Sequence, residues 1–422
     1  MVRAIGAFGL AAGAAVLMTA CTGTSGKPVP RPTPPKRSIA FTVDHPTEPA
    51  FDPVDVRLSG LKPGEHVTVT STATDLRSAV WTGVGKYTAD ASGVVDLAKQ
   101  PSTGGTYTGV DGSGLLWSMN PPAGSKEFGY IPSAGTGFDV TLTAVGEGSA
   151  GGALLTRESA TPGVTVRSLT LVQDQVVGKV FLPAGISSAK PRPAVLVFGG
   201  SEGGESQDLT ASVLASEGYP AMSIAYFGAP GLPATLADVP LEYFEHAATD
   251  LSNEPGVDRS RIFVEGGSRG SEAALLAAQN YPEVIHGVIV TSPSSQVYAG
   301  YPDGTKAAWT LLGTPIPVGT AIPVDHIAGP VLVFAGADDA LWPSAVYAGN
   351  LSVAFANAHN PFPYKVTVYP GAGHMSDSYP TLPVMTTETE ASSGVLKNLG
   401  GTRQADAAAQ ADTWQQILTL LK

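Results

Sequence analysis

The chain has 422 residues, of which 43% are hydrophobic, so we expect two sizeable hydrophobic cores rather than one ordinary domain. A single cysteine excludes an internal disulfide and a cysteine-rich zinc or iron–sulfur site. With 36 acidic against 24 basic residues the formal net charge is −12, and no nucleic-acid partner is expected, because such binding depends mainly on clustered lysine and arginine.

Residues 1–20 have the pattern of a secretory signal peptide. Arg3 is followed by an apolar run from Ala4 to Met18, which is shorter than the ~20 residues that span a bilayer. The run ends in Leu17-Met18-Thr19-Ala20-Cys21, which resembles a bacterial lipobox. We therefore predict that Cys21 is lipidated and that the chain is exported and anchored to the cell membrane. The alternative is a cleaved signal peptide followed by an incidental cysteine.

Residues 21–37 are predicted to form a linker, since they are rich in proline and lack a periodic apolar pattern. Residues 38–163 contain short alternating runs between glycine and proline turns, such as Val54–Leu58, Val67–Thr70 and Phe138–Leu142. This alternation predicts an all-β, immunoglobulin-like sandwich without a catalytic cluster. Four aromatic residues are expected in its core or at a domain interface: Trp81, Tyr87, Tyr107 and Trp117.

Residues 164–422 change to apolar runs that alternate with helical stretches. The predicted strands are 194–198, 221–225, 261–265, 288–291, 331–335 and 365–369. Apolar residues at helical spacing predict helices around Leu241–Leu251 and Trp414–Leu421. Strands that are apolar throughout are typical of a sheet covered on both faces. A doubly wound, mostly parallel α/β domain is therefore expected.

A candidate nucleophile follows the predicted strand 261–265. That strand runs into Gly266-Gly267-Ser268-Arg269-Gly270 and then into a helical segment. G-x-S-x-G in this context is typical of a nucleophile elbow, a sharp turn that lifts the serine hydroxyl clear of the sheet. We predict that Ser268 is the nucleophile; a purely structural turn is the alternative.

Candidates for the acid and the base follow two later strands, in the order Ser, acid, His that α/β-hydrolases use. The predicted strand 331–335 precedes Asp338 and Asp339, and the strand 365–369 precedes a glycine-containing loop that carries His374. We predict His374 as the base. Asp339 is the preferred acid because the acid of these enzymes usually lies three residues after a glycine such as Gly336, and Asp338 is the alternative.

A tetrahedral intermediate also needs hydrogen-bond donors at its oxyanion. The backbone N–H of Arg269 is one candidate, and Gly200 or Ser201, in the glycine-rich loop 199–204, supplies the other. The side chain of Arg269 has two interpretations, an ion pair with Glu272 or a contact with an anionic group of the substrate. Neither a metal ion nor a cofactor is expected.

Short segments along most of the chain after the linker carry a family resemblance. They are Gly105–Tyr107, Gly114–Trp117, Val195–Gly199, Ile224–Phe227, Leu241–Phe244, Gly336–Asp339 with Trp342, and Tyr369–Pro370 with Gly373–His374. This series resembles the acyl-CoA thioesterase and bile acid-CoA:amino acid N-acyltransferase family. The resemblance implies an immunoglobulin-like domain before an α/β-hydrolase domain, with Ser268, Asp339 and His374 as the triad.

The same resemblance implies a reaction. Family members that transfer acyl groups to amino acids typically carry a cysteine nucleophile, whereas Ser268 resembles that of the thioester hydrolases. We expect a serine hydrolase that cleaves acyl thioesters or carboxylic esters through an acyl-enzyme intermediate. Two alternatives stay open: transfer of the acyl group to an amino or hydroxyl acceptor, and a non-catalytic envelope lipoprotein.

Overall fold

The computed structural model describes residues 37–126, 128–132, 136–374, 379–390 and 393–422. The signal peptide, Cys21 and all of the linker except Arg37 lie outside these residues, so the lipid anchor stays a prediction. Within the described ranges, no helix is both long and apolar enough to cross a membrane. Residues 36–422 form one compact unit.

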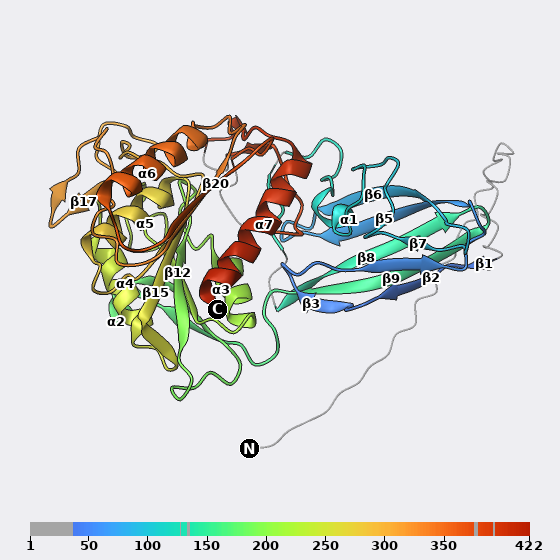
Figure 1. Ribbon diagram of the computed structural model, residues 1–422, viewed down its shortest axis with the longest axis horizontal. Coiled ribbons are helices and arrows are strands. Elements are labelled where there is room, and N and C mark those ends of the chain that lie inside the picture. Colours follow the sequence, from blue (N-terminus) through green and yellow to red (C-terminus); the bar gives the residue numbers. More distant parts are fainter. Residues whose placement is uncertain (1–36, 127, 133–135, 375–378, 391–392) are drawn as a thin grey trace, which may run out of the picture. The chain divides into compact units, whose positions relative to one another are not determined.

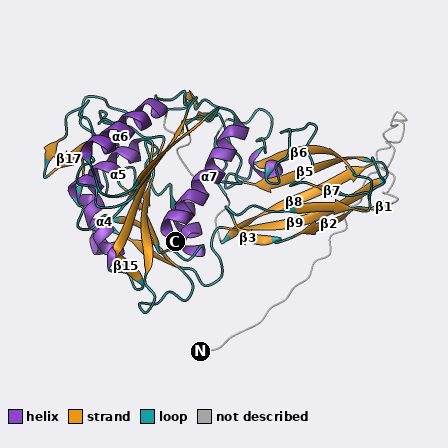
Figure 2. Cartoon of the chain, viewed as in Figure 1, coloured by secondary structure: helices purple, strands orange, loops and turns teal. Residues whose placement is uncertain are grey.

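The first part of the described chain consists mainly of strands in two sheets (Figure 2). The larger sheet has the order β1-β9-β8-β5-β6, with β3 also beside β9, and the smaller has the order β2-β4-β7. Their bounds are β1 Arg37–Ser38, β2 Ala40–Val43, β3 Thr47–Pro49, β4 Val56–Ser59, β5 His66–Thr74, β6 Val80–Thr88, β7 Val95–Asp96, β8 Gly137–Gly146 and β9 Ser149–Glu158. Helix α1 (Gly114–Trp117) lies between β7 and β8 in the chain. Residues along β5 alternate between buried and partly exposed, as expected for a sandwich strand, and the four predicted core aromatics are all buried.

The second part contains an eight-stranded sheet of order β10-β11-β13-β12-β15-β16-β19-β20 (Figure 1). Its strands are β10 Thr165–Leu169, β11 Val177–Leu182, β12 Arg192–Phe198, β13 Ala221–Ala225, β15 Val257–Gly267, β16 Val288–Thr291, β19 Val331–Gly336 and β20 Tyr364–Tyr369. The six strands expected from the sequence are β12, β13, β15, β16, β19 and β20, and they pair in parallel. The antiparallel strands β10 and β11 were not expected. The predicted α/β-hydrolase fold is confirmed.

Helices cover both faces of this sheet, as Figure 1 shows for α7 on one side and α4 to α6 on the other. The helices are α2 Leu171–Asp174, α3 Asp208–Ser216, α4 Glu242–Ser252, α5 Arg269–Asn280, α6 Ser344–Ala358 and α7 Arg403–Leu421. Strand β15 shows the division. Phe263 packs in the apolar cluster that contains residues of α3 and α7, whereas Ile262 and Val264 pack in the cluster that contains residues of α4, α5 and α6.

Two large apolar clusters are present, and one of them extends from the sandwich into the α/β region. One cluster includes the sandwich core together with the α3 and α7 face of the large sheet. At this junction the ring of Phe51 packs edge-on against Trp414, with 5.0 Å between the ring centroids. The apolar packing therefore continues from the sandwich into the α/β region, and the boundary between residues 163 and 164 stays a prediction.

Two small sheets lie at the edge of the α/β region. One contains β14 (Val239–Pro240), β17 (Trp309–Leu311) and β18 (Thr314–Pro315), and the other contains β21 (Thr387–Thr389) and β22 (Leu396–Asn398). The carboxyl ends of the parallel strands meet at one edge of the large sheet, which is where ligands usually bind in such folds.

Candidate active site

Ser268 occupies the sharp turn between β15 and α5. Its backbone has φ 51° and ψ −120°, a left-handed conformation that costs a non-glycine residue of order 1–3 kcal/mol. The glycines on either side allow a close approach of the backbone: a Cβ on Gly266 would lie 2.4 Å from Gly270 O, and one on Gly270 would lie 2.3 Å from Gly199 O. The predicted elbow geometry is therefore present, and both glycines are required by it.

His374 and Asp339 are brought into direct contact. Nδ1 of His374 lies 2.8 Å from Oδ2 of Asp339, and the two side chains are only 3% and 2% exposed. The other carboxylate oxygen, Oδ1, accepts hydrogen bonds from the backbone N–H groups of Leu341 (2.9 Å) and Trp342 (3.2 Å). By contrast, the exposed carboxylate of Asp338 has no hydrogen bond to any described residue. Of the two candidates, the acid that touches His374 is Asp339.

Ser268 lies at the same edge of the sheet as this pair. Its N–H donates to Thr291 O at 3.0 Å, and the indole N–H of Trp342 donates to the next carbonyl, that of Ser292, at 3.1 Å. The Trp342 ring also packs against His374, with 5.9 Å between centroids. Between the described residues, no hydrogen bond joins Ser268 Oγ to His374. Because such bonds often tighten only in the substrate complex, the catalytic role of Ser268 stays a prediction.

The loop that carries His374 is also held by the carboxylate of Asp406, which the sequence did not indicate. Gly373 N–H donates to Oδ1 of Asp406 at 2.6 Å, and His374 N–H donates to Leu399 O at 2.8 Å. Burial raises the pKa of Asp406 to about 6, and the charge of Asp339 adds to that rise, although the hydrogen bond from Gly373 opposes it. Asp406 is thus a positioning residue for the histidine loop.

The predicted oxyanion donors differ in their surroundings. In the described part of the chain the N–H of Arg269 has no hydrogen-bond acceptor, and neither does that of Ser201. Gly200 packs against Ser268, because a Cβ at Gly200 would lie 3.0 Å from the Ser268 Cβ. Its N–H donates to both carboxylate oxygens of Glu202, at 2.9 and 3.0 Å. Gly200 is therefore the loop residue next to Ser268, and Glu202 covers its N–H.

The side chain of Arg269 forms the ion pair that was one of its two predicted interpretations. Its Nε donates to Oε1 of Glu272 at 2.6 Å, and Glu272 is fully buried. The other carboxylate oxygen accepts from the indole of Trp309 (2.8 Å) and from Tyr298 N–H (3.1 Å). Arg269 also donates to Tyr298 O at 3.3 Å, so its guanidinium is hydrogen-bonded to groups of the protein itself.

Aromatic side chains line the region beside His374. The Trp342 ring lies 5.4 Å from that of Tyr298 and 6.2 Å from that of Tyr347, centroid to centroid. Tyr298 and Tyr347 contact each other through their hydroxyl groups. This cluster provides apolar surface close to the base and to the carboxyl end of β16.

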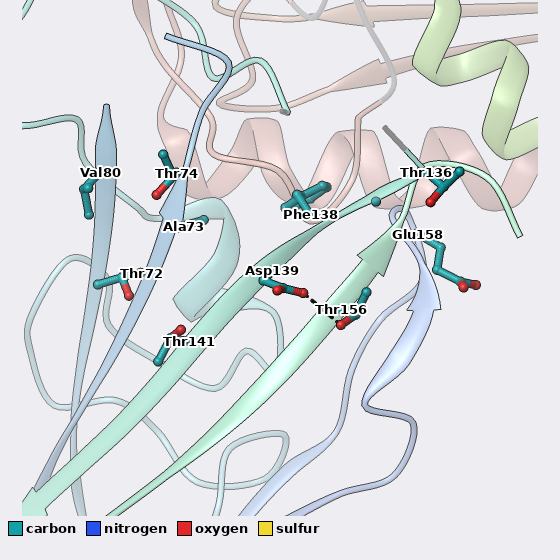
Figure 3. A pocket seen from close by; sticks show the side chains of 11 residues that line it. Thr72, Ala73, Thr74, Val80, Thr136, Phe138, Asp139, Thr141, Thr156 and Glu158 are labelled. Atoms are coloured by element: carbon teal, nitrogen blue, oxygen red, sulfur yellow. Dashed lines mark hydrogen bonds between the residues drawn. The ribbon is translucent and has the colours of Figure 1, made fainter. Parts of the chain in front are cut away.

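A hollow of about 490 Å³ lies elsewhere, on the outer face of the sandwich sheet (Figure 3). Its polar lining residues are Thr72, Thr74, Thr136, Asp139, Thr141, Thr156 and Glu158. Asp139 accepts a hydrogen bond from Thr156 at 2.9 Å. The lining of this hollow contains none of the predicted site residues and no histidine, so we do not assign catalysis to it. Within the described ranges, no three His, Cys, Asp or Glu side chains are grouped so as to hold a metal ion.

Comparison with known proteins gives a consistent result. Residues 52–171 match the model of the acyl-CoA thioester hydrolase/BAAT N-terminal region, and residues 239–303 and 313–422 match that of the BAAT/acyl-CoA thioester hydrolase C terminal. Acyl-coenzyme A thioesterase 3 of Mus musculus is 30% identical over 399 residues, which cover 87% of this chain and 90% of that protein. Acyl-coenzyme A amino acid N-acyltransferase 1 of Mus musculus is 29% identical over 394 residues, which cover 87% and 93%.

Among solved structures, a puromycin-hydrolyzing peptidase of Mycobacterium tuberculosis aligns with a TM-score of 0.45 and 16% identity, over 91% of this chain and 67% of that one. A likeness at this level bears on neither substrate nor mechanism. The two family models, by contrast, cover most of the described chain, and they do so in the same order as the sandwich and the α/β region. The chain therefore belongs to the acyl-CoA thioester hydrolase/BAAT family.

Proposed function

We propose that this chain hydrolyses acyl thioesters or carboxylic esters with Ser268 as nucleophile. Its family contains thioester hydrolases and acyltransferases, so acyl transfer from a thioester is the chemistry common to its relatives. The observation that carries the assignment of residues is the buried hydrogen bond between His374 and Asp339, at the sheet edge where the serine elbow also lies. The aromatic cluster of Trp342, Tyr298 and Tyr347 offers an apolar surface near His374, which favours a substrate with an apolar acyl group.

In the proposed mechanism, Nε2 of His374 removes the proton from Ser268 Oγ as the oxygen attacks the acyl carbon. Asp339 accepts a hydrogen bond from Nδ1 and stabilises the imidazolium that forms. The N–H groups of Arg269 and Gly200 stabilise the oxyanion. The bond to the leaving sulfur or oxygen then breaks, and His374 returns the proton to the leaving group. Water, deprotonated by His374, attacks the acyl-enzyme and releases the acid.

Acyl transfer to an acceptor other than water is the second candidate, since one of the relatives is named as an amino acid N-acyltransferase. Serine at position 268 favours hydrolysis, because the transferase members of the family typically carry cysteine there. Supplying glycine or taurine together with the acyl thioester separates the two reactions. A conjugate at the expense of free acid identifies a transferase, and free acid alone identifies a hydrolase.

A fluorophosphonate probe together with an acyl panel tests the proposal. We expect the wild type to be labelled and to cleave p-nitrophenyl esters or acyl thioesters. Ser268→Ala should lose both labelling and hydrolysis, whereas Ser295→Ala, a serine near the same edge whose Oγ contacts Asn350, should keep both. Failure of the wild type to label, or full hydrolysis by Ser268→Ala, would contradict the assignment.

We also propose that the chain is exported and held at the membrane through lipid on Cys21. The support is the apolar run before a lipobox-like sequence that contains the single cysteine of the chain. Expressed in a bacterium that lipidates proteins, the full chain should fractionate with membranes and incorporate a fatty-acid label. Cys21→Ser should lose the label; a wild type that is unlabelled would contradict the proposal.

A further inference from the structure

The glycine-rich loop places a carboxylate directly beside the nucleophile. Glu202 accepts the Gly200 N–H with both oxygens, and its Oε1 also accepts a hydrogen bond from Ser206 Oγ at 2.7 Å. Gly200 itself packs on Ser268. We propose that Glu202 is a specificity-determining residue, which makes the site favour acyl donors with a neutral or positively charged leaving group over polyanionic acyl carriers. This inference rests on the proposed acyl transfer at Ser268.

The charge of Glu202 is not neutralised by the protein. In the part of the chain that the structure describes, no lysine, arginine or histidine forms an ion pair with it. The cation at the elbow and the lysine that reaches the neighbouring Glu205 are already paired: Arg269 with Glu272 at 2.6 Å, and Lys179 with both Glu205 and Asp208. Glu202 is also exposed to solvent, so its negative charge faces an arriving substrate.

A second carboxylate, that of Glu388 in β21, adds negative charge near Glu202. Strand β21 pairs with β22, and Leu399, directly after β22, accepts the His374 N–H. The pKa of Glu388 is raised, first by desolvation and next by the negative charge of Glu202, whereas the charges of Lys397 and Arg77 and a hydrogen bond from the Gly129 backbone oppose the rise. The lysine on β22, Lys397, forms its ion pair with Glu390 at 2.6 Å and with Glu388 forms none within 4.0 Å. Glu202, whose carboxylate binds the Gly200 N–H, therefore lies close enough to a second carboxylate to be sensed by it, and neither forms an ion pair with a described residue.

This arrangement has two consequences for a substrate. A carbonyl oxygen that takes the Gly200 N–H displaces the Glu202 carboxylate, which then loses two hydrogen bonds next to the scissile bond. An ammonium group or a neutral hydrogen-bond donor on the leaving group can pair with that carboxylate. The phosphates of a coenzyme A leaving group would instead be repelled by Glu202 and Glu388, and like charges at an entrance cost affinity and association rate.

Three thioesters with the same acyl group and different charges on the thiol test the proposal. They are butyrylthiocholine, with one positive charge, S-butyryl-N-acetylcysteamine, which is neutral, and butyryl-CoA, which is polyanionic. In each, the bond from Ser268 Oγ to the acyl carbon forms, the carbon–sulfur bond breaks and the free thiol is measured. For the wild type we expect kcat/KM to fall in that order, and the differences to shrink as ionic strength rises.

The charge-removing variants give the decisive comparison. Glu202→Gln keeps an oxygen that can accept the Gly200 N–H, so it changes charge with little effect on the loop. We expect Glu202→Gln, and more strongly the double variant with Glu388→Gln, to raise the kcat/KM ratio of butyryl-CoA to the neutral thioester by about 3–10-fold. Glu205→Gln is the matched control on the same loop, and it should leave that ratio unchanged because Glu205 is paired with Lys179.

The outcomes separate this inference from the proposed function. If Ser268→Ala still releases thiol from the neutral substrate, the proposed function fails. If Ser268→Ala is inactive but Glu202→Gln and the double variant leave the ratio unchanged, only the inference about Glu202 is overturned. A wild type that prefers butyryl-CoA at low ionic strength also overturns it.

Discussion

At the scale of single residues, two adjacent aspartates compete for one role, and the local backbone decides between them. The N–H groups of Leu341 and Trp342 both donate to Oδ1 of Asp339, which fixes the carboxylate and leaves Oδ2 for His374. Asp338 lies one residue earlier and is exposed, without a hydrogen bond from its side chain to any described residue. A carboxylate fixed by backbone donors can hold the imidazole in one tautomer and one orientation.

This arrangement predicts a large asymmetry between the two aspartates. Asp339→Asn should lower kcat by about 10²–10⁴-fold, because an amide in that position cannot stabilise the imidazolium. Asp338→Asn, which changes the same chemical group one residue away, should stay within about twofold of the wild type. The measurement is kcat for one neutral ester or thioester, with unfolding curves to show that both variants are folded. An equal loss of kcat in the two variants would show that the assignment of Asp339 as the acid is wrong.

The sequence could indicate some of these residues and not others. Ser268 directly follows β15 and His374 lies in the loop after β20. Parallel strands bring their carboxyl ends together, so chain order alone placed both residues at one edge. Asp406 and Glu202 carry no such signal. Asp406 acts through a hydrogen bond from Gly373, which lies 33 residues earlier, and Glu202 matters because its loop folds back on Gly200. The first contact is long-range. The second is local, and only the packing of Gly200 on Ser268 brings it to the site, so neither follows from a periodic pattern in the sequence.

At the scale of elements, strand β15 carries a buried carboxyl group three residues before Ser268. Glu265 pairs in the sheet with Val197 on one side and Ile289 on the other, within an apolar surface. Its Oε2 has no hydrogen-bond partner among the described residues, and burial raises the pKa of Glu265 to about 7. An unpaired carboxylate in such a place is destabilising, so the strand is more stable when Glu265 is protonated.

The pH dependence of stability follows from this shift. The native state holds the Glu265 proton more tightly than the unfolded chain, whose glutamate pKa is near 4.5. Stability from this group is therefore complete below pH 4.5 and is lost as the pH rises through about 7. Replacing it by Gln should remove that loss. Relative to the wild type, Glu265→Gln should gain about 1–3 kcal/mol in free energy of unfolding between pH 5 and pH 8.

Urea unfolding at the two pH values measures this gain. Glu283→Gln is the control, because it removes a carboxylate that is exposed in the segment after α5, and it should change the free energy of unfolding by about 0.5 kcal/mol or less. A parallel pH response of wild type and Glu265→Gln would show that Glu265 does not ionise in the native state over this range.

A strand or helix could be predicted from the sequence where its buried residues form an apolar pattern. The runs at 221–225 and 288–291 coincide with β13 and β16, since a strand buried on both faces is apolar at every position. The two-residue strands β14 and β18 have too few residues to show any period. Strand β10, which was not expected, is mostly exposed and contains Arg167 and Ser168, so it lacks the buried pattern on which the prediction relied.

At the scale of the whole molecule, the sandwich and the α/β region are joined by polar as well as apolar contacts at the start of α7. The guanidinium of Arg403 donates to the carbonyls of Val384 (2.6 Å), Trp117 (3.1 Å) and Met119 (2.6 Å). Burial lowers the pKa of Arg403 to about 10, so it stays charged near neutral pH. Directly before it, Thr402 N–H donates to Gly371 O at 2.9 Å, in the loop that leads to His374. The start of α7 therefore contacts both the sandwich and the loop that leads to His374.

Removing this arginine should affect both stability and catalysis. Arg403→Ala leaves several carbonyl groups without a donor, and we expect it to lower the free energy of unfolding by about 2–4 kcal/mol. It should also lower kcat, because the start of α7 fixes the loop that holds His374. Arg259→Ala is the control: Arg259 is exposed, and within the described residues its side chain hydrogen-bonds to Ser252 and Asn253 alone, so its loss should cost about 0.5 kcal/mol or less. If Arg403→Ala unfolds at the same urea concentration as Arg259→Ala, the junction does not stabilise the molecule. If it is destabilised with kcat unchanged, the sandwich supports the fold without any influence on the histidine loop.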